Sequence, residues 1–263
     1  RRRDRPTTWG LWGQFTPVVQ RVDRLEVEER TLADGTVRVA VDLMEVERAA
    51  KTLLKNGCEA VCLFFINGYA NPKNEKKAAE SLRKIWPNEH VSVATEILPE
   101  IREFERCSTT TLNAYLQPPV ANYLARIEDR IKEKNRTTEI LIVQSNGGVM
   151  SVETAKSRPI KTALSGPAAG VVAAREIASA AGFNNIITGD MGGTSFDVSL
   201  VANGQNMLTA QANIDFGMTI RTPMIEMTTI GAGGGSIAKI DKTGFLEIGP
   251  ESAGSDPGPV CYG

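Results

Sequence analysis

Two glycine-rich clusters hold the residue types with which this sequence could do chemistry. In the first, an apolar run leads into Asp190, and Gly192, Gly193, Thr194 and Asp197 follow. Glycines remove the Cβ atoms that would keep phosphate oxygens away from backbone N–H groups. Successive N–H groups in a tight turn then form an anion-binding concavity, and the threonine hydroxyl adds a donor. The pattern predicts a turn that binds phosphate groups.

The two carboxylates of this cluster indicate a cation. Asp190 would repel a phosphate unless a divalent cation lay between them, so it suggests Mg²⁺, held in part through water. Asp197 carries a second negative charge near the phosphate. It must bind the same metal, act as a base, or lie at a distance from the phosphate. We therefore expect Asp190 to be a metal ligand, and Asp190 and Asp197 to be catalytic. A hairpin with a glycine bulge and no ligand is the structural alternative.

The second cluster comprises Gly231, Gly233, Gly234, Gly235 and Ser236. It is not a dinucleotide-binding fingerprint, because a serine takes the third glycine position and because the residues that follow predict a β-hairpin rather than a helix. The sequence also contains no Gly-Lys-Ser/Thr of a Walker A loop. A loop whose backbone lies flat against a nucleotide base or ribose is one interpretation of the cluster, and a flexible linker is the other.

Strands must position the first cluster. The apolar run Ile186 to Thr188 and the alternating run Phe196 to Leu200 predict a strand–turn–strand bend. Upstream, residues 139–144 predict a strand that ends in the turn Ser145-Asn146-Gly147-Gly148. This turn is either a ligand-binding turn at the end of a strand or a plain turn. A helix of small residues starts at Gly166-Pro167 and ends at Gly182.

Helices and strands alternate through the earlier part of the chain. Asp34-Gly35 predicts a hairpin turn, and Asp42 predicts the start of a helix that Gly57 ends. A short apolar strand, a helix after Asn71-Pro72 and a second strand follow. This order favours βαβ units and a largely parallel sheet. A further helix reaches about Leu116 and is predicted to break at Pro118-Pro119.

Composition changes in the middle of the chain. Residues 1–146 hold 5 glycines and 44 charged residues, whereas residues 147–263 hold 19 glycines and 17 charged residues. We expect an α/β part with a β-hairpin start over 1–140, and a partial glycine-rich nucleotide-binding lobe over 141–263.

Charge and residue usage exclude several classes of protein. A formal net charge of −1 over 263 residues argues against a nucleic-acid partner, and no apolar run is long enough for a membrane. The lone histidine, His90, excludes zinc sites that need two imidazoles from this chain. Four cysteines without a CxxC pair predict reduced thiols and a cytoplasmic location.

Six stretches in their order along the chain resemble the hydantoinase A/oxoprolinase family, within the actin-like ATPase superfold. They are ERCSTTTLNAYLQP (105–118), LIVQSNGGVMSVETA (141–155), LSGPAAGV (164–171), GDMGGTSFDVSL (189–200), TIGAGGGSIA (229–238) and GPESAGSDPGPVCYG (249–263). The resemblance is dense over 105–263 and loose before it. It implies an α/β fold of incomplete actin-like (ribonuclease H-like) ATPase lobes, with helices on both faces of a mixed sheet.

The resemblance also implies an activity. Family members use ATP to activate a carbonyl or amide oxygen by phosphoryl transfer, in hydantoinase- and oxoprolinase-type hydrolysis of cyclic amides or in acetone- and acetophenone-type carboxylation. It implies ATP and Mg²⁺ as cofactors and a small-molecule substrate. Asp190, Gly192, Gly193 and Thr194 would hold the phosphates and Mg²⁺, and the second glycine cluster would line the adenosine side. A hydantoinase B-like subunit or domain is the expected partner, together with the remainder of the polypeptide.

One departure from the family pattern qualifies these expectations. The superfold uses two phosphate loops, and the family's first, a DxGGTxxD-like run, does not occur in this sequence. Phosphoryl transfer depends on positioning and on charge neutralisation from both lobes. We therefore expect a fragment that binds ATP weakly and is inactive alone. A non-catalytic nucleotide-binding scaffold is the alternative outside the enzyme class.

Overall fold

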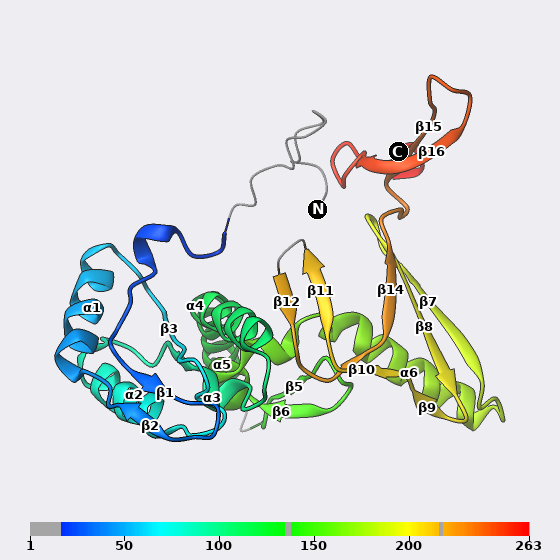
Figure 1. The fold of residues 1–263 in the computed structure, drawn as a ribbon. Helices are drawn as coiled ribbons and strands as arrows, with labels where there is room; N and C mark the ends of the chain where they lie inside the picture. Colours follow the sequence, from blue (N-terminus) through cyan, green and yellow to red (C-terminus); the bar gives the residue numbers. More distant parts are fainter. Residues whose placement is uncertain (1–16, 135–137, 216–217, 263) are drawn as a thin grey trace.

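The computed structural model describes residues 17–134, 138–215 and 218–262. Figure 1 shows the first lobe, residues 17–98, at one side and the long helix α4 beside it. The sheet of β7, β8 and β14 and the β15–β16 hairpin lie on the other side. The helices are α1 (Leu43–Lys55), α2 (Lys73–Ile85), α3 (Ala94–Ile97), α4 (Glu103–Glu133), α5 (Val152–Ser157) and α6 (Ser165–Ala180), with short 3-10 turns η2 (Arg21–Asp23), η3 (Pro159–Thr162) and η4 (Val260–Tyr262).

The described strands form seven small sheets. The strands of the first lobe and the middle of the chain are β1 (Arg30–Thr31), β2 (Val37–Val39), β3 (Val61–Leu63), β4 (Val91–Val93), β5 (Leu141–Val143) and β6 (Val149–Ser151). The later strands are β7 (Ile186–Met191), β8 (Phe196–Ala202), β9 (Gln205–Asn206), β10 (Leu208–Thr209), β11 (Ala212–Asp215), β12 (Met218–Ile220), β13 (Met224–Ile225), β14 (Met227–Ile230), β15 (Ser236–Ile240) and β16 (Leu246–Ser252).

The first lobe is built around a βαβ unit. Strands β3 and β4 pair in parallel, and α2 connects them. Buried residues of α1 and α2, among them Val46, Ala50 and Leu82, pack with both strands in one apolar core. Helix α4 contacts the same two strands. The predicted βαβ unit is therefore confirmed in this lobe. The prediction of a largely parallel sheet is wrong, because every other described strand pair is antiparallel.

Local signals in the sequence place α1 correctly. The carboxylate of Asp42 accepts hydrogen bonds from the amides of Met44 and Glu45, and Gly57 adopts φ +82 just beyond the end of the helix. The second hydrogen bond of a capping box, from the Asp42 amide to the Glu45 carboxylate, is not formed. Glu45 instead accepts a hydrogen bond from the amide of Glu28, at 2.7 Å. The carboxylate therefore ties the segment before β1 to the start of the helix.

A buried ion pair joins α2 to α4. Arg106 and Glu75 are both fully buried, and Nη2 of Arg106 lies 3.5 Å from Oε1 of Glu75. The two carboxylate oxygens of Glu75 also accept hydrogen bonds from the amides of Phe65 and Thr95. Glu103 contacts Arg106 at 2.6 Å. Nε and Nη2 of Arg106 make no hydrogen bond among the described residues. Because both charges are buried, the lobe depends on the pairing of Arg106 with its carboxylates.

The predicted break at Pro118-Pro119 is wrong, because α4 runs through both prolines. Neither proline can donate the usual helical hydrogen bond, and an interior proline costs a helix about 3 kcal/mol. Buried contacts on both sides hold the helix in one direction. Asn113 donates to Ser92 Oγ at 2.9 Å, and Leu124 packs in a second core cluster beyond the prolines.

The turn at residues 145–148 is a hairpin turn between the antiparallel strands β5 and β6. Ser145 is buried, and its hydroxyl lies within hydrogen-bond distance of the carbonyl oxygens of Lys161 and Ala163. A Cβ on Gly147 would lie 2.7 Å from the side chain of Val172. These contacts favour the plain-turn interpretation, since the polar and glycine residues serve packing.

The last part of the chain places β7, β8 and β14 in one antiparallel sheet against α6. Val201 of β8 packs with Ala168 and Val171 of α6 in a small core. Beyond β14, strands β15 and β16 form an antiparallel hairpin that extends away from the rest of the molecule (Figure 1). The predicted hairpin after the second glycine cluster is therefore confirmed.

The expected α/β fold class is confirmed, although the described strands form several small sheets rather than one continuous mixed sheet. All four cysteines are free thiols. In the part of the chain that the structure describes, no helix combines the length and hydropathy needed to span a bilayer.

Candidate phosphate-binding site

The first glycine cluster lies at the tip of the β7–β8 hairpin. The two strands pair from Ile186 opposite Val201 to Met191 opposite Phe196, so the turn comprises residues 192–195. A hydrogen bond of 2.9 Å from the Gly192 amide to the Ser195 carbonyl closes this turn. The predicted strand–turn–strand bend is confirmed.

The two glycine clusters, about forty residues apart in sequence, meet at this tip. The amide of Gly234 donates to the carbonyl of Gly192 at 2.9 Å, and the amide of Gly235 donates to that of Gly193 at 2.8 Å. A Cβ on Gly233 would lie 2.6 Å from the Gly192 oxygen, closer than any side chain tolerates. The glycines of the second cluster therefore allow one backbone to lie directly against the other.

Backbone donors remain available on the first loop. Among the described residues, none accepts a hydrogen bond from the amides of Gly193, Thr194 or Ser195. Gly192, Gly193 and Thr194 are exposed. A Cβ on Gly193 would meet nothing within 4 Å, so one side of this loop is open, whereas Gly233 of the second loop packs against the Thr194 nitrogen on the other side. Consecutive N–H groups without an acceptor on the open side of a turn form the kind of concavity that binds an anion.

The two candidate catalytic carboxylates lie side by side below the turn. Asp190 on β7 is directly opposite Asp197 on β8. Residues opposite each other in an antiparallel pair project from the same face, with Cβ atoms about 5 Å apart. On the next strand Thr229 is opposite Asp197, and its hydroxyl donates to Oδ1 of Asp197 at 2.5 Å. Asp190, Asp197 and Thr229 thus form one polar row across the sheet.

This row fits a magnesium ion. Like charges opposite each other on neighbouring strands destabilise a sheet, and a divalent cation between them removes that repulsion. The described residues contain no group of three or more histidine, cysteine or acidic side chains suited to a metal. Mg²⁺ does not require one, since it is typically held by one or two carboxylates together with water and substrate phosphates. Asp190 and Asp197 would supply those carboxylates.

The second loop is held by its own serine. The Ser236 hydroxyl accepts a hydrogen bond from the Gly233 amide at 2.8 Å, and the Ser236 amide donates to the Gly233 carbonyl. A Cβ on Gly231 would meet nothing within 4 Å, whereas one on Gly249 would lie 2.7 Å from the Gly231 carbonyl. The loop is therefore an ordered structure in contact with the first, which disfavours the linker interpretation.

Two contributors to this site were not predicted from the sequence. Thr229 orients the Asp197 carboxylate, and Gly249 lets the end of the β15–β16 hairpin approach the second loop. The pair Thr228-Thr229 just before the glycine cluster was the available signal. Only the pairing of β14 with β8 shows which threonine faces the aspartate.

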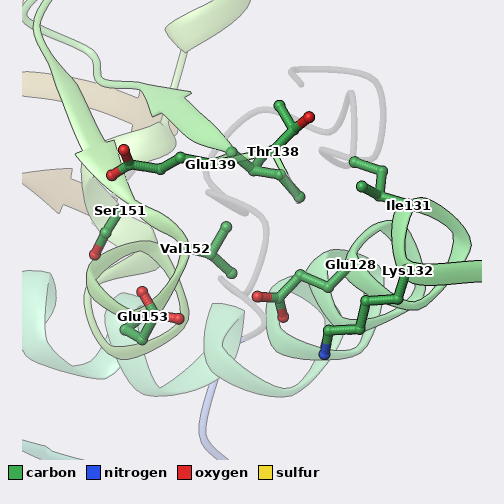
Figure 2. Close-up of a pocket in the computed structure, with 9 residues that line it drawn as sticks. Glu128, Ile131, Lys132, Thr138, Glu139, Ser151, Val152 and Glu153 are labelled. Atoms are coloured by element: carbon green, nitrogen blue, oxygen red, sulfur yellow. The ribbon is translucent and has the colours of Figure 1, made fainter. Parts of the chain in front are cut away.

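A separate hollow of about 350 Å³ lies at the end of α4, and it shares no residue with the glycine loops. Figure 2 shows Glu128 and Lys132 of α4 on one side, with Glu139 and Glu153 opposite. Glu128 forms an ion pair with Lys156. The acidic lining of the hollow makes the hollow unsuited to phosphate groups.

Two family matches and two similar sequences indicate the same family. The hydantoinase/oxoprolinase family matches residues 106–263, and the hydantoinase/oxoprolinase N-terminal region matches residues 1–86. The caprolactamase subunit alpha of Pseudomonas jessenii is 37% identical over 94% of this chain and 35% of that subunit. The acetophenone carboxylase gamma subunit of Aromatoleum aromaticum is 34% identical over 94% of this chain and 34% of that subunit.

Solved structures show the same fold. The crystal structure of the ATP-dependent caprolactamase from Pseudomonas jessenii matches with a TM-score of 0.77 and 36% identity, over 90% of this chain and 34% of that one. The nucleotide-free structure of acetone carboxylase matches with a TM-score of 0.72 and 28% identity, over 87% of this chain and 32% of that one. The chain spans about a third of the length of each of these proteins. Its matched regions and its structure show that the chain belongs to the hydantoinase/oxoprolinase family.

Proposed function

We propose that this chain binds the phosphates of ATP, with Mg²⁺, in an ATP-dependent enzyme that activates a carbonyl or amide oxygen by phosphorylation. One observation carries the proposal: the amides of Gly193 to Ser195 have no hydrogen-bond acceptor among the described residues, and they lie at the end of two strands whose facing carboxylates are Asp190 and Asp197. The arrangement offers donors for phosphate oxygens and oxygen ligands for a cation at one place. The ATP-dependent caprolactamase shares this fold.

In the proposed reaction the substrate oxygen attacks the γ-phosphorus of ATP, the bond from that phosphorus to the ADP oxygen breaks, and ADP leaves. In hydrolysis, water then adds to the neighbouring carbon, the carbon–nitrogen bond of the amide breaks, and a second water releases the phosphate. The amides of the first loop hold the phosphates in line. Mg²⁺, when bound, neutralises phosphate charge. Asp190 and Asp197 would hold the cation, and Thr229 keeps Asp197 in one orientation through its hydrogen bond. The second loop, from Gly231 to Ser236, lies against the adenosine side.

The proposal divides the molecule near residue 140. Both glycine loops lie in residues 141–263, the nucleotide-binding lobe, while residues 1–140 contribute the βαβ unit and α4. The second phosphate loop that an actin-like site requires comes from the remainder of the polypeptide, and a hydantoinase B-like subunit or domain completes the enzyme. The relatives named as subunits of caprolactamase and of acetophenone carboxylase support an enzyme of several subunits.

Cyclic-amide hydrolysis is the first candidate, because the caprolactamase subunit is 37% identical to this chain and its name implies a lactam substrate. Carboxylation of a ketone is the second candidate, favoured by the likeness to acetophenone and acetone carboxylases. The two differ in the bond that forms. In hydrolysis water attacks the activated carbon, whereas in carboxylation the α-carbon of the ketone is the nucleophile and bicarbonate supplies the electrophilic carbon.

Calorimetric titration with Mg·ATP tests the proposal, on the chain alone and with the rest of its polypeptide or its partner subunit. We expect weak binding alone and tighter binding in the assembly. The Asp190→Asn variant should bind at least tenfold more weakly, which corresponds to about 1.4 kcal/mol. Asp129→Asn on the exposed surface of α4 is the matched control. Equal affinity of Asp190→Asn and the unchanged assembly would reject the site.

A further inference from the structure

The second glycine loop holds the same peptide groups that the first loop would turn toward a phosphate. The carbonyl of Gly192 and the N–H of Gly193 belong to one peptide group, and the carbonyl of Gly193 and the N–H of Thr194 belong to the next. The amides of Gly234 and Gly235 donate to these two carbonyls, at 2.9 and 2.8 Å. In a planar trans peptide the N–H points opposite to the carbonyl. Each N–H of the first loop therefore points away from the amide that holds its carbonyl.

The direction of these peptide groups decides whether the first loop attracts or repels an anion. A peptide group turned the other way would present its carbonyl oxygen, with its partial negative charge, to the phosphate. Gly192 and Gly193 are exposed and have no Cβ that would hinder such a rotation. The hydrogen bonds from the second loop therefore fix which end of each peptide group faces outward.

The end of β16 in turn holds both ends of the second loop. The amide of Ala253 donates to the carbonyl of Gly235 at 2.8 Å. At the other end of the loop, Gly249 adopts φ +66, and a Cβ there would lie 2.7 Å from the carbonyl oxygen of Gly231. Gly235 and Gly249 are both buried. The second loop thus lies between the first loop and the end of β16.

We propose that Gly249 and Ala253, at the end of β16, position the phosphate-binding amides through the second loop. The inference rests on the proposed function and deepens it. Ala253 holds Gly235, and Gly235 holds the carbonyl of Gly193. The next amide, that of Thr194, then faces the phosphate. Donors that are aimed before the ligand arrives need no reorganisation during the reaction, which is the basis of electrostatic stabilisation in phosphoryl transfer.

The second loop would then act on the phosphate groups as well as lie on the adenosine side. The two roles predict different results with tripolyphosphate, which carries three linked phosphates and no adenosine. Disturbing a loop that only lined the adenosine would weaken the binding of ATP and leave the binding of tripolyphosphate unchanged. Disturbing a loop that aims the amides would weaken the binding of both.

Calorimetric titration of the assembled enzyme with Mg·ATP and with Mg·tripolyphosphate tests the inference. Gly249→Ala places a Cβ against the second loop and should weaken the binding of both ligands at least tenfold. Gly244→Ala is the matched control and should leave both affinities unchanged. Gly244 also has a positive φ, +89, on the same hairpin, but a Cβ there would meet nothing within 4 Å.

The outcomes separate this inference from the proposed function. Unchanged affinity for tripolyphosphate in Gly249→Ala, or an equal loss in Gly244→Ala, would overturn the positioning role alone. No binding of either ligand by the unaltered enzyme would reject the proposed function, and the inference with it.

Hydrogen exchange of the unaltered enzyme gives a second readout, which does not depend on how a variant folds. Mg·tripolyphosphate should slow exchange of the Gly235 and Ala253 amides at least fivefold, because a bound phosphate fixes the peptide groups whose carbonyls they support. The Val61 amide in the first lobe should exchange at an unchanged rate. Slower exchange at Gly193 and Thr194, without any change at Gly235 and Ala253, would overturn the inference.

Discussion

The first lobe and the tip of the β7–β8 hairpin are held together by different means. The lobe has a core of buried side chains around β3 and β4 and a fully buried ion pair, Arg106 with Glu75. The tip is exposed, and backbone hydrogen bonds between two glycine loops hold it. Large apolar residues near it, such as Ile187 and Met191, are exposed. One region is ordered by side-chain packing and the other by the absence of side chains.

This contrast has a functional meaning. A packed core tolerates little change in volume or charge, and its loss unfolds the region. A tip built from glycines buries little surface. Its residue types therefore affect ligand binding more than the free energy of unfolding. Substitutions in the two regions should therefore affect different measurements.

The largest expected effect on stability is in the buried ion pair. Glu75→Gln removes a charge that Arg106 needs, and it should lower the free energy of unfolding by about 3 kcal/mol. Urea unfolding measures this change. Glu80→Gln, on the exposed side of the same helix, should change it by less than about 0.5 kcal/mol. Similar unfolding curves for the two variants would mean that the pair contributes nothing to the lobe.

The glycine tip should respond in the opposite way. Gly233→Ala places a Cβ 2.6 Å from the Gly192 carbonyl, which forces the two loops apart. We expect at least a tenfold loss of Mg·ATP affinity in the assembled enzyme, with unfolding changed by about 1 kcal/mol or less. Gly170→Ala in α6, where a Cβ meets nothing within 4 Å, is the control. Unchanged nucleotide affinity in Gly233→Ala would mean that the second loop takes no part in nucleotide binding.

The smallest effect is chemical and needs no substitution. Burial raises the pKa of the Cys62 thiol to about 12, and it also raises the pKa of Cys107. The thiolate is the reactive form, so at pH 8 only about one Cys62 in ten thousand is ionised. Iodoacetamide should therefore modify the exposed Cys261 first. Mass spectrometry of the time course checks the order, and equally rapid labelling of Cys62, which is half-buried, would contradict the raised pKa of its thiol.

Local patterns predicted much of the fold because their causes are local. Asp42 starts a helix through its own carboxylate, and Asp34-Gly35 forms the turn between β1 and β2 with Gly35 at φ +84. The strand–turn–strand bend at the first glycine cluster follows in the same way. The prediction failed at Pro118-Pro119, because buried contacts of Asn113 and Leu124 outweigh the local cost of proline.

The sequence by itself determined most of the elements, the family resemblance and the residue types of the proposed phosphate site, since capping, turn chemistry and periodicity act over a few residues. Tertiary structure alone decided that the two glycine clusters lie in contact and that Thr229 donates a hydrogen bond to Asp197. It also decided that Arg106 is buried against Glu75. Each of these is a contact between residues about thirty or more apart in the chain. Such contacts depend on how strands pair and helices pack, which no local pattern specifies.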